Sequence, residues 1–181
     1  MGIIVLFYIL RRLVELLRVI NTGGTFNKIY DPVKGELVVP PHSKAVESAL
    51  YSLKHGCKVT VQGLLYKDSL DMDDSDRKKL CDAVFGSCED MIVVVHGTDT
   101  MHKSASVIDR SAGGFHEKRV VLTGAMVPFS IDPVEATANL ASAITAVRYL
   151  APGVYIAMHG YVLLYENIVK NRERGVFERV E

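Results

Sequence analysis

Short apolar runs alternate with amphipathic stretches along most of the chain. The apolar runs are rich in Val, Ile and Leu. Continuous runs of this kind are typical of strands that are buried on both faces of a parallel sheet. We therefore expect five strands, at residues 16–20, 58–64, 91–95, 119–122 and 154–158.

The stretches between these runs place apolar residues three and four positions apart, which predicts helices. The clearest start is Asp132-Pro133-Val134-Glu135, with an N-cap Asp, Pro at the first helical position and Glu three residues after the cap. An Asp-rich segment begins another helix, and Gly56 is expected to end the first one. The expected helices are 43–54, 73–85, 101–112 and a fourth that starts at Asp132 and leads into Leu140, Ile144 and Val147.

This order of elements predicts an α/β fold, since strands that alternate with helices form a parallel sheet. We expect an open parallel sheet of about five strands with helices on both faces, a three-layer arrangement of the flavodoxin-like or Rossmann-like kind. Ligands of such sheets bind beyond the carboxyl ends of the strands. Functional residues are therefore expected directly after each strand.

Composition excludes several classes of protein. The 181 residues include 21 Lys and Arg and 21 Asp and Glu, so no basic surplus favours nucleic acid. The apolar run 3–10 is too short to cross a bilayer, and its positive charges follow it, which is not the order of a secretory signal. We expect no membrane association. Residues 1–12 are interpreted as an extension, either a docked helix or a dispensable segment, and residues 13–181 as one domain.

The cysteines indicate a reducing compartment. Cys57, Cys81 and Cys88 include no C-x-x-C pair, which argues against a disulfide scaffold and a structural zinc. A cytoplasmic location is expected. His96 and His102 are six residues apart, so they do not form the helical pair of a metal site, and the chain has neither G-x-G-x-x-G nor a P-loop. We expect no metal and no cofactor.

The residues after the expected strands are small, hydroxylic or charged. They comprise Asn21-Thr22-Gly23-Gly24-Thr25, Lys67-Asp68-Ser69, His96-Gly97-Thr98-Asp99-Thr100 and Thr123-Gly124-Ala125-Met126. Glycines let backbone N–H groups approach a ligand closely, and facing turns with hydroxyls can supply a nucleophile and an oxyanion pocket. His96 and His159 also follow strands, and we interpret both as structural imidazoles.

Three of these segments carry a resemblance to a known family. Thr22-Gly23-Gly24-Thr25-Phe26, His96-Gly97-Thr98-Asp99-Thr100-Met101 and Leu122-Thr123-Gly124-Ala125-Met126 with Pro128 are similar to signature segments of the bacterial-type L-asparaginases, in the same order and spacing. The similarity runs over about residues 17–177 and corresponds to the family's larger amino-terminal domain. It is greatest to a short-chain branch without the carboxyl-terminal domain.

The resemblance implies five catalytic residues. Thr25 matches the family's primary nucleophile, and Tyr30 matches the tyrosine that hydrogen-bonds it. Thr98 and Asp99 match the second threonine and the aspartate that holds the substrate's α-amino group. Lys170 matches the lysine that completes the Thr-Lys-Asp set. Because Asp99 close to Lys170 would favour the charged ammonium, we interpret Lys170 as a proton shuttle or electrostatic support.

The resemblance also implies a substrate pocket. Ser69 matches the serine that binds the substrate's α-carboxylate, and Gly24, Gly97, Thr98 and Asp99 complete the expected pocket. The chain departs from the family at Leu70, where many members have glutamine. The family's glutamate that supports the nucleophile's tyrosine comes from the carboxyl-terminal domain of a neighbouring subunit. We therefore expect either that another carboxylate replaces it or that Thr25 and Tyr30 work without this support.

We therefore expect a metal-free amidohydrolase that converts L-asparagine to L-aspartate and ammonia, with weak glutaminase activity implied by the resemblance alone. Two alternatives stay open: a non-catalytic domain that binds amino acids or amides, and a subunit of an amidotransferase-type enzyme that shares this domain. A homodimer or higher homo-oligomer is expected, because a second copy would cover a site that otherwise lies open to water.

Overall fold

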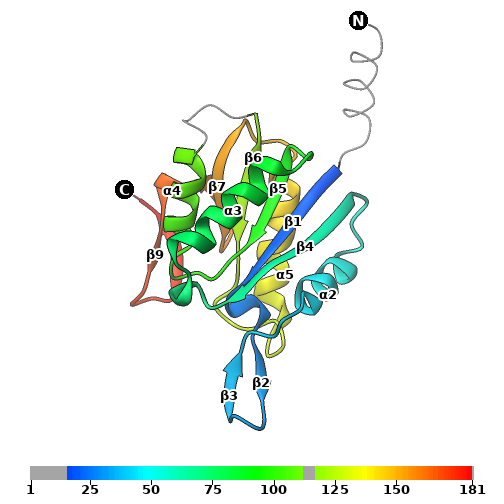
Figure 1. Ribbon diagram of the computed structural model, residues 1–181, viewed down its shortest axis with the longest axis vertical. Coiled ribbons are helices and arrows are strands. Elements are labelled where there is room, and N and C mark those ends of the chain that lie inside the picture. The colour runs from blue at the N-terminus through cyan, green and yellow to red at the C-terminus, as the bar shows by residue number, and fades with distance from the viewer. Residues whose placement is uncertain (1–15, 112–116, 181) are drawn as a thin grey trace, which may run out of the picture.

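The computed structural model describes residues 16–111 and 117–180. The expected extension 1–12 and the last residue of the expected helix 101–112 lie outside the described residues. A six-stranded sheet forms the centre of the domain, in the order β4-β1-β5-β6-β7-β8 (Figure 1). Its strands are β1 Leu16–Gly23, β4 Lys58–Lys67, β5 Met91–Val95, β6 Arg119–Thr123, β7 Gly153–Met158 and β8 Tyr161–Leu164.

The five expected strands are all present, and they run parallel to their neighbours. Their spatial order, taken in chain order, is 2-1-3-4-5, which is the flavodoxin-like order. The expected α/β class is thus confirmed. The sixth strand, β8, is an addition that pairs antiparallel with β7 at the sheet edge.

Helices cover both faces of the sheet. One core cluster packs α2 (Lys44–Leu53) and α5 (Pro133–Ala146) on one face, and the other packs α3 (Asp74–Gly86) and α4 (Met101–Ser111) on the opposite face. Successive side chains of β1 point to opposite faces of the sheet, so Val19 packs in the first cluster and Ile20 in the second. This double burial explains the continuous apolar runs in the sequence.

The helix starts are close to the expected ones, but two local assignments differ. Asp132 does cap α5, since its side chain accepts a hydrogen bond from the Val134 N–H, but Glu135 does not complete a capping box. Its carboxylate instead accepts the N–H groups of Met126 and Val127, which the fold brings to it. Gly56 does not end α2; Lys54 adopts the left-handed conformation there, with φ of 49°.

Short elements that the sequence analysis did not identify surround the carboxyl edge of the sheet. Two are hairpins, β2 Ile29–Asp31 with β3 Glu36–Val38, and β9 Ile168–Asn171 with β10 Val176–Arg179. The others are the 3-10 turns η1 Thr25–Asn27, η2 Ser69–Asp71 and η3 Tyr165–Asn167. In the part of the chain that the structure describes, no helix is long and apolar enough to cross a membrane.

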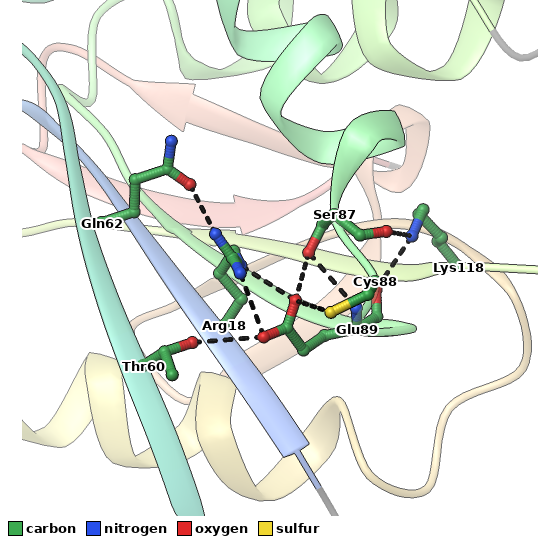
Figure 2. A network of polar contacts seen from close by, with 7 residues as sticks. All are labelled: Arg18, Thr60, Gln62, Ser87, Cys88, Glu89 and Lys118. Atoms are coloured by element: carbon green, nitrogen blue, oxygen red, sulfur yellow. Dashed lines mark hydrogen bonds and ion pairs between the residues drawn. The ribbon is translucent and has the colours of Figure 1, made fainter. Parts of the chain in front are cut away.

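A polar network fastens the amino-terminal end of the sheet (Figure 2). Arg18 on β1 donates from Nε and Nη2 to the two carboxylate oxygens of Glu89, at 2.9 and 3.1 Å, and from Nη1 to Gln62 on β4. Lys118 donates to the carbonyl oxygens of Ser87 and Glu89. Because these residues come from β1, β4 and the segments before β5 and β6, the network holds the parallel strands in register at the end away from the expected site.

The strand order reverses between β1 and β5. The chain leaves β1 toward α2 on one face and leaves β5 toward α4 on the other. The two connections therefore diverge and open a position for a ligand between the ends of β1 and β5. The segments Thr22-Gly23-Gly24-Thr25 and His96-Gly97-Thr98-Asp99 lie at these two strand ends.

Candidate active site

The loops after β1, β4 and β5 are in backbone contact at the switch point. Gly24 has φ of 71°, and a Cβ there would lie 2.4 Å from the Cα and N of Gly97. A Cβ on Gly97 would in turn lie 2.6 Å from the Cβ and Oγ of Ser69. These separations exclude any side chain at the two glycines. The expected pocket residues Gly24, Gly97 and Ser69 are therefore brought together.

Gly24 contributes to this arrangement through close approach, not as a free donor. Its N–H donates to the Lys67 carbonyl at 2.9 Å, so it is already engaged. Gly23, with φ of 101°, meets Lys67 in the same way, since a Cβ there would lie 2.5 Å from that carbonyl oxygen. The paired glycines thus allow the loop after β1 to pack closely against the end of β4.

Thr25 begins the turn η1 and is half-buried. The loop that carries it is held by Asn21 and Asn27, whose amides exchange hydrogen bonds of 2.9 and 3.0 Å, and the Asn27 amide also donates to the Gly23 carbonyl. Within residues 16–111 and 117–180, no hydrogen bond engages the Thr25 hydroxyl. The backbone of the loop is fixed and its hydroxyl is available.

Thr98, Asp99 and Lys170 form one hydrogen-bonded set. Lys170 on β9 donates from Nζ to Thr98 Oγ1 at 2.8 Å and to Asp99 Oδ1 at 2.9 Å. Its side chain is only 15% exposed. A lysine ammonium donates and does not accept, so in this geometry Lys170 polarises the Thr98 hydroxyl. The set has the composition expected from the sequence.

Arg172 also contacts this set, and the sequence analysis did not identify it. Its Nη1 donates to Asp99 Oδ1 at 2.9 Å, the same oxygen that Lys170 contacts. A signal was present in the sequence, because residues two apart at the end of a strand point to the same side, and the family resemblance already indicates Lys170.

Ser69 is buried with an unpartnered hydroxyl. Its side chain is inaccessible to solvent, and its Oγ finds no hydrogen-bond partner among the described residues. Its carbonyl accepts the Thr100 hydroxyl at 2.8 Å, and the Arg77 guanidinium donates to that same hydroxyl at 3.3 Å. Buried polar groups are normally satisfied, so this hydroxyl is suited to bind a ligand group. Thr100 and Arg77 serve as scaffold.

Tyr30 is not brought to Thr25. It lies on β2, its side chain is 62% exposed, and in the described part of the chain no hydrogen bond joins the two residues. Its hairpin projects from the body of the domain (Figure 1). The expected support of Thr25 by Tyr30 stays a prediction.

Both histidines at strand ends occupy structural positions. His96 is fully buried with Nδ1 on the Gly97 carbonyl at 2.8 Å, and burial lowers its pKa to about 4, helped by the positive charge of Arg77 and opposed by that hydrogen bond. His159 contacts Glu135 through Nε2 at 2.9 Å, and its Nδ1 accepts the Phe177 N–H. Neither imidazole is directed at Thr25 or Thr98 by these contacts.

No group of three or more His, Cys, Asp or Glu side chains among residues 16–111 and 117–180 is arranged to hold a metal ion. The three cysteines are free thiols. The described residues supply hydroxyls, the Asp99 carboxylate and the cations of Lys170 and Arg172 to this site. Such a set can polarise a hydroxyl nucleophile and bind a zwitterion.

Comparison with known proteins matches most of the chain to one family. Residues 16–177 match the family described as "Asparaginase, N-terminal". An L-asparaginase of Thermococcus kodakarensis is 28% identical over 162 residues, which cover 88% of this chain and 49% of the relative. The solved structure of the thermostable L-asparaginase from Thermococcus kodakarensis superposes with a TM-score of 0.78 at 27% identity, over 91% of this chain and 51% of its own.

A relative with another name is also similar. In Archaeoglobus fulgidus, one of the subunits of a glutamyl-tRNA(Gln) amidotransferase is 28% identical over 145 residues, which cover 79% of this chain and 34% of the relative. The chain spans about half the length, or less, of the curated relatives that it matches. Because the family match extends over most of the chain and includes every described site residue, the chain belongs to the asparaginase family and corresponds to its N-terminal domain.

Proposed function

We propose that this domain hydrolyses the side-chain amide of L-asparagine, giving L-aspartate and ammonia, with Thr25 as the nucleophile. The observation that carries the proposal is the Lys170, Thr98 and Asp99 set, with Nζ at 2.8 Å from the Thr98 hydroxyl and 2.9 Å from the Asp99 carboxylate. This set lies at the switch point of an asparaginase-family domain, where an open sheet binds its ligand.

The reaction proceeds through a covalent ester. The Thr25 hydroxyl oxygen attacks the amide carbon and its proton passes to the leaving nitrogen, so that ammonia departs and the aspartyl group stays on Thr25. A water molecule then attacks the ester carbon, which releases aspartate and restores the hydroxyl. A threonine hydroxyl is a weak nucleophile without assistance. Lys170 assists by holding a positive charge beside the Thr98 hydroxyl, which relays the proton.

Recognition of the substrate depends on its two charged groups. Asp99 binds the α-ammonium through a charge-assisted hydrogen bond, and the unpartnered Ser69 hydroxyl binds the α-carboxylate. Because Gly24 and Gly97 carry no side chain, the loops after β1, β4 and β5 pack closely, which brings Ser69 to the loop of Thr98 and Asp99. Tyr30 supports Thr25 only when its side chain turns toward that loop.

Ammonia release from L-asparagine by the purified chain tests the proposal. We expect turnover without added metal or partner, and a kcat/KM for L-glutamine below that for L-asparagine. The relatives named as amidotransferase subunits favour a second candidate, in which the same site supplies an amide nitrogen to a partner enzyme. Turnover by the free chain would contradict a strict need for a partner enzyme. A lack of ammonia release would contradict the asparaginase proposal.

We also propose a homodimer in the cytoplasm. The hairpin of β2 and β3 exposes apolar side chains, with Val33 at 94% and Leu37 at 41%, and a second copy of the chain would cover them. Light scattering over a dilution series measures the assembly. A monomer at all concentrations with full activity would contradict the proposed dimer.

A further inference from the structure

Two cations contact the same oxygen of the Asp99 carboxylate. Lys170 Nζ and Arg172 Nη1 both donate to Asp99 Oδ1, each at 2.9 Å. The three ionised groups carry one more positive charge than negative. The function proposed above assigns Asp99 to the substrate's ammonium, so an amino-acid amide brings a third cation to this carboxylate.

The two cations differ in how firmly they are held. Lys170 is 15% exposed and also bonds to Thr98. Arg172 is 66% exposed, and Asp99 is its one hydrogen-bond partner within the described residues. An ion pair with an exposed partner contributes little, because water screens the exposed charge and the long side chain loses rotamer freedom. Arg172 is therefore the less firmly held of the two cations and the more easily displaced.

Hydrogen bonds hold the backbone near Arg172, whereas the Arg172 side chain is largely exposed. The Asn171 side-chain oxygen accepts the N–H groups of Glu173 and Arg174 at 3.1 and 3.0 Å, and Gly175 completes the turn with φ of 65°. The turn between β9 and β10 thus keeps Arg172 at one place beside Asp99. The guanidinium can leave and return without a change in the main chain.

We propose that Arg172 is a specificity-determining residue whose guanidinium competes with the substrate's ammonium for Asp99. This inference rests on the proposed amidase function and names a substrate preference of that site. Arg172 weakens binding of amides that carry an α-ammonium, and it leaves unaffected the binding of amides that carry a carboxylate alone. Loss of the guanidinium improves the apparent affinity for L-asparagine by up to about five-fold, the range of an exposed ion pair.

Arg172→Ala is compared with Arg174→Ala on two substrates. Arg174 is a matched control, because it lies on the same turn, is 71% exposed and pairs with Glu178 instead of Asp99. The substrates are L-asparagine and succinamate, which is asparagine without its amino group. We expect Arg172→Ala to lower KM for L-asparagine up to about five-fold with kcat and the succinamate parameters unchanged, and Arg174→Ala to change neither.

Two kinetic results would overturn the proposal. An unchanged ratio of the two kcat/KM values in Arg172→Ala would show that the guanidinium does not compete. A rise in KM for both substrates would instead show that Arg172 binds the shared carboxylate.

A binding measurement separates this inference from the proposed activity. Titration calorimetry with L-aspartate and succinate, which differ only by the ammonium, reports the same competition without turnover. If ammonia release fails but Arg172→Ala tightens L-aspartate relative to succinate, the amidase proposal fails and the role of Arg172 holds. Equal changes for both ligands, or no binding of either, would overturn the role of Arg172.

Discussion

Neutralising Glu89 removes the centre of the polar network at the amino-terminal end of the sheet, so Glu89→Gln is expected to destabilise the fold. The side chain of Glu89 is 4% exposed, and that of Arg18 is 26% exposed. Burial alone would raise the pKa of Glu89, but the hydrogen bonds from Arg18 and Ser87 outweigh burial and lower it to about 2 from the usual 4.5. This difference corresponds to roughly 3 kcal/mol of stability at pH 7.

Part of that amount is screened, because Arg18 is partly exposed and can turn to water when its partner is lost. We therefore expect Glu89→Gln to lower the free energy of unfolding by about 2–3 kcal/mol at pH 7, near the lower end for a broken buried ion pair. Urea denaturation followed by circular dichroism measures it. Asp82→Asn is the control, because the pair of Lys78 with Asp82 is exposed on α3 and should change stability by no more than about 0.5 kcal/mol.

The pH dependence gives an independent check. A carboxyl group whose pKa is lowered by folding contributes its full stability above its unfolded pKa near 4.5, and that contribution declines as pH falls toward 2. The difference in the free energy of unfolding between wild type and Glu89→Gln should thus fall to less than half of its pH 7 value by pH 3. Equal stability of the two proteins at pH 7, or a difference that does not change with pH, would refute the assigned role of the Arg18 and Glu89 pair.

Three further predictions concern the site itself. Gly24→Ala should cost on the order of 1–3 kcal/mol in urea denaturation, because its φ of 71° and a Cβ 2.4 Å from Gly97 force the loops apart; an unchanged midpoint would contradict this contact. Lys170→Met should lower kcat about 10²-fold or more, and a loss of only a few-fold would make Lys170 a scaffold residue. Burial keeps His96 neutral with a pKa of about 4, so its contribution to stability is lost as pH falls from 6.5 toward 4, and His96→Asn should flatten the stability profile in that window.

The sheet and its helices could be predicted from the sequence because burial on two faces leaves a continuous apolar signal. The central strands β5 and β6 are runs of mostly buried apolar residues, whereas the edge strand β4 alternates apolar with polar residues and gives a weaker signal. The hairpins carry no such signal, since strands such as Ile29–Asp31 are three residues long and largely solvent-facing. The carboxylate of Glu135 could not be placed either, because its partners are the backbone N–H groups of a loop that only the fold brings near.

The site divides in the same way. The hydroxyls and glycines after β1 and β5 could be predicted, because the carboxyl ends of parallel strands meet at one edge. Lys170 lies 71 residues beyond Asp99, and only the family resemblance indicated it. For Arg172 the sequence offers only its spacing of two residues from Lys170, and its hydrogen bond to Asp99 depends on the fold. The ion pair of Arg18 and Glu89 could not be predicted either, because its partners are also 71 residues apart in the sequence.

Ammonia release by Thr25→Ala and Thr25→Ser shows whether the Thr25 hydroxyl is the nucleophile of an amide-hydrolysing site. The loop is held by the amides of Asn21 and Asn27 and not by Thr25, so both variants should fold like the wild type by circular dichroism. We predict that Thr25→Ala releases no ammonia from L-asparagine and that Thr25→Ser, which keeps the hydroxyl, retains measurable turnover. Wild-type turnover in folded Thr25→Ala would show that Thr25 is not the nucleophile.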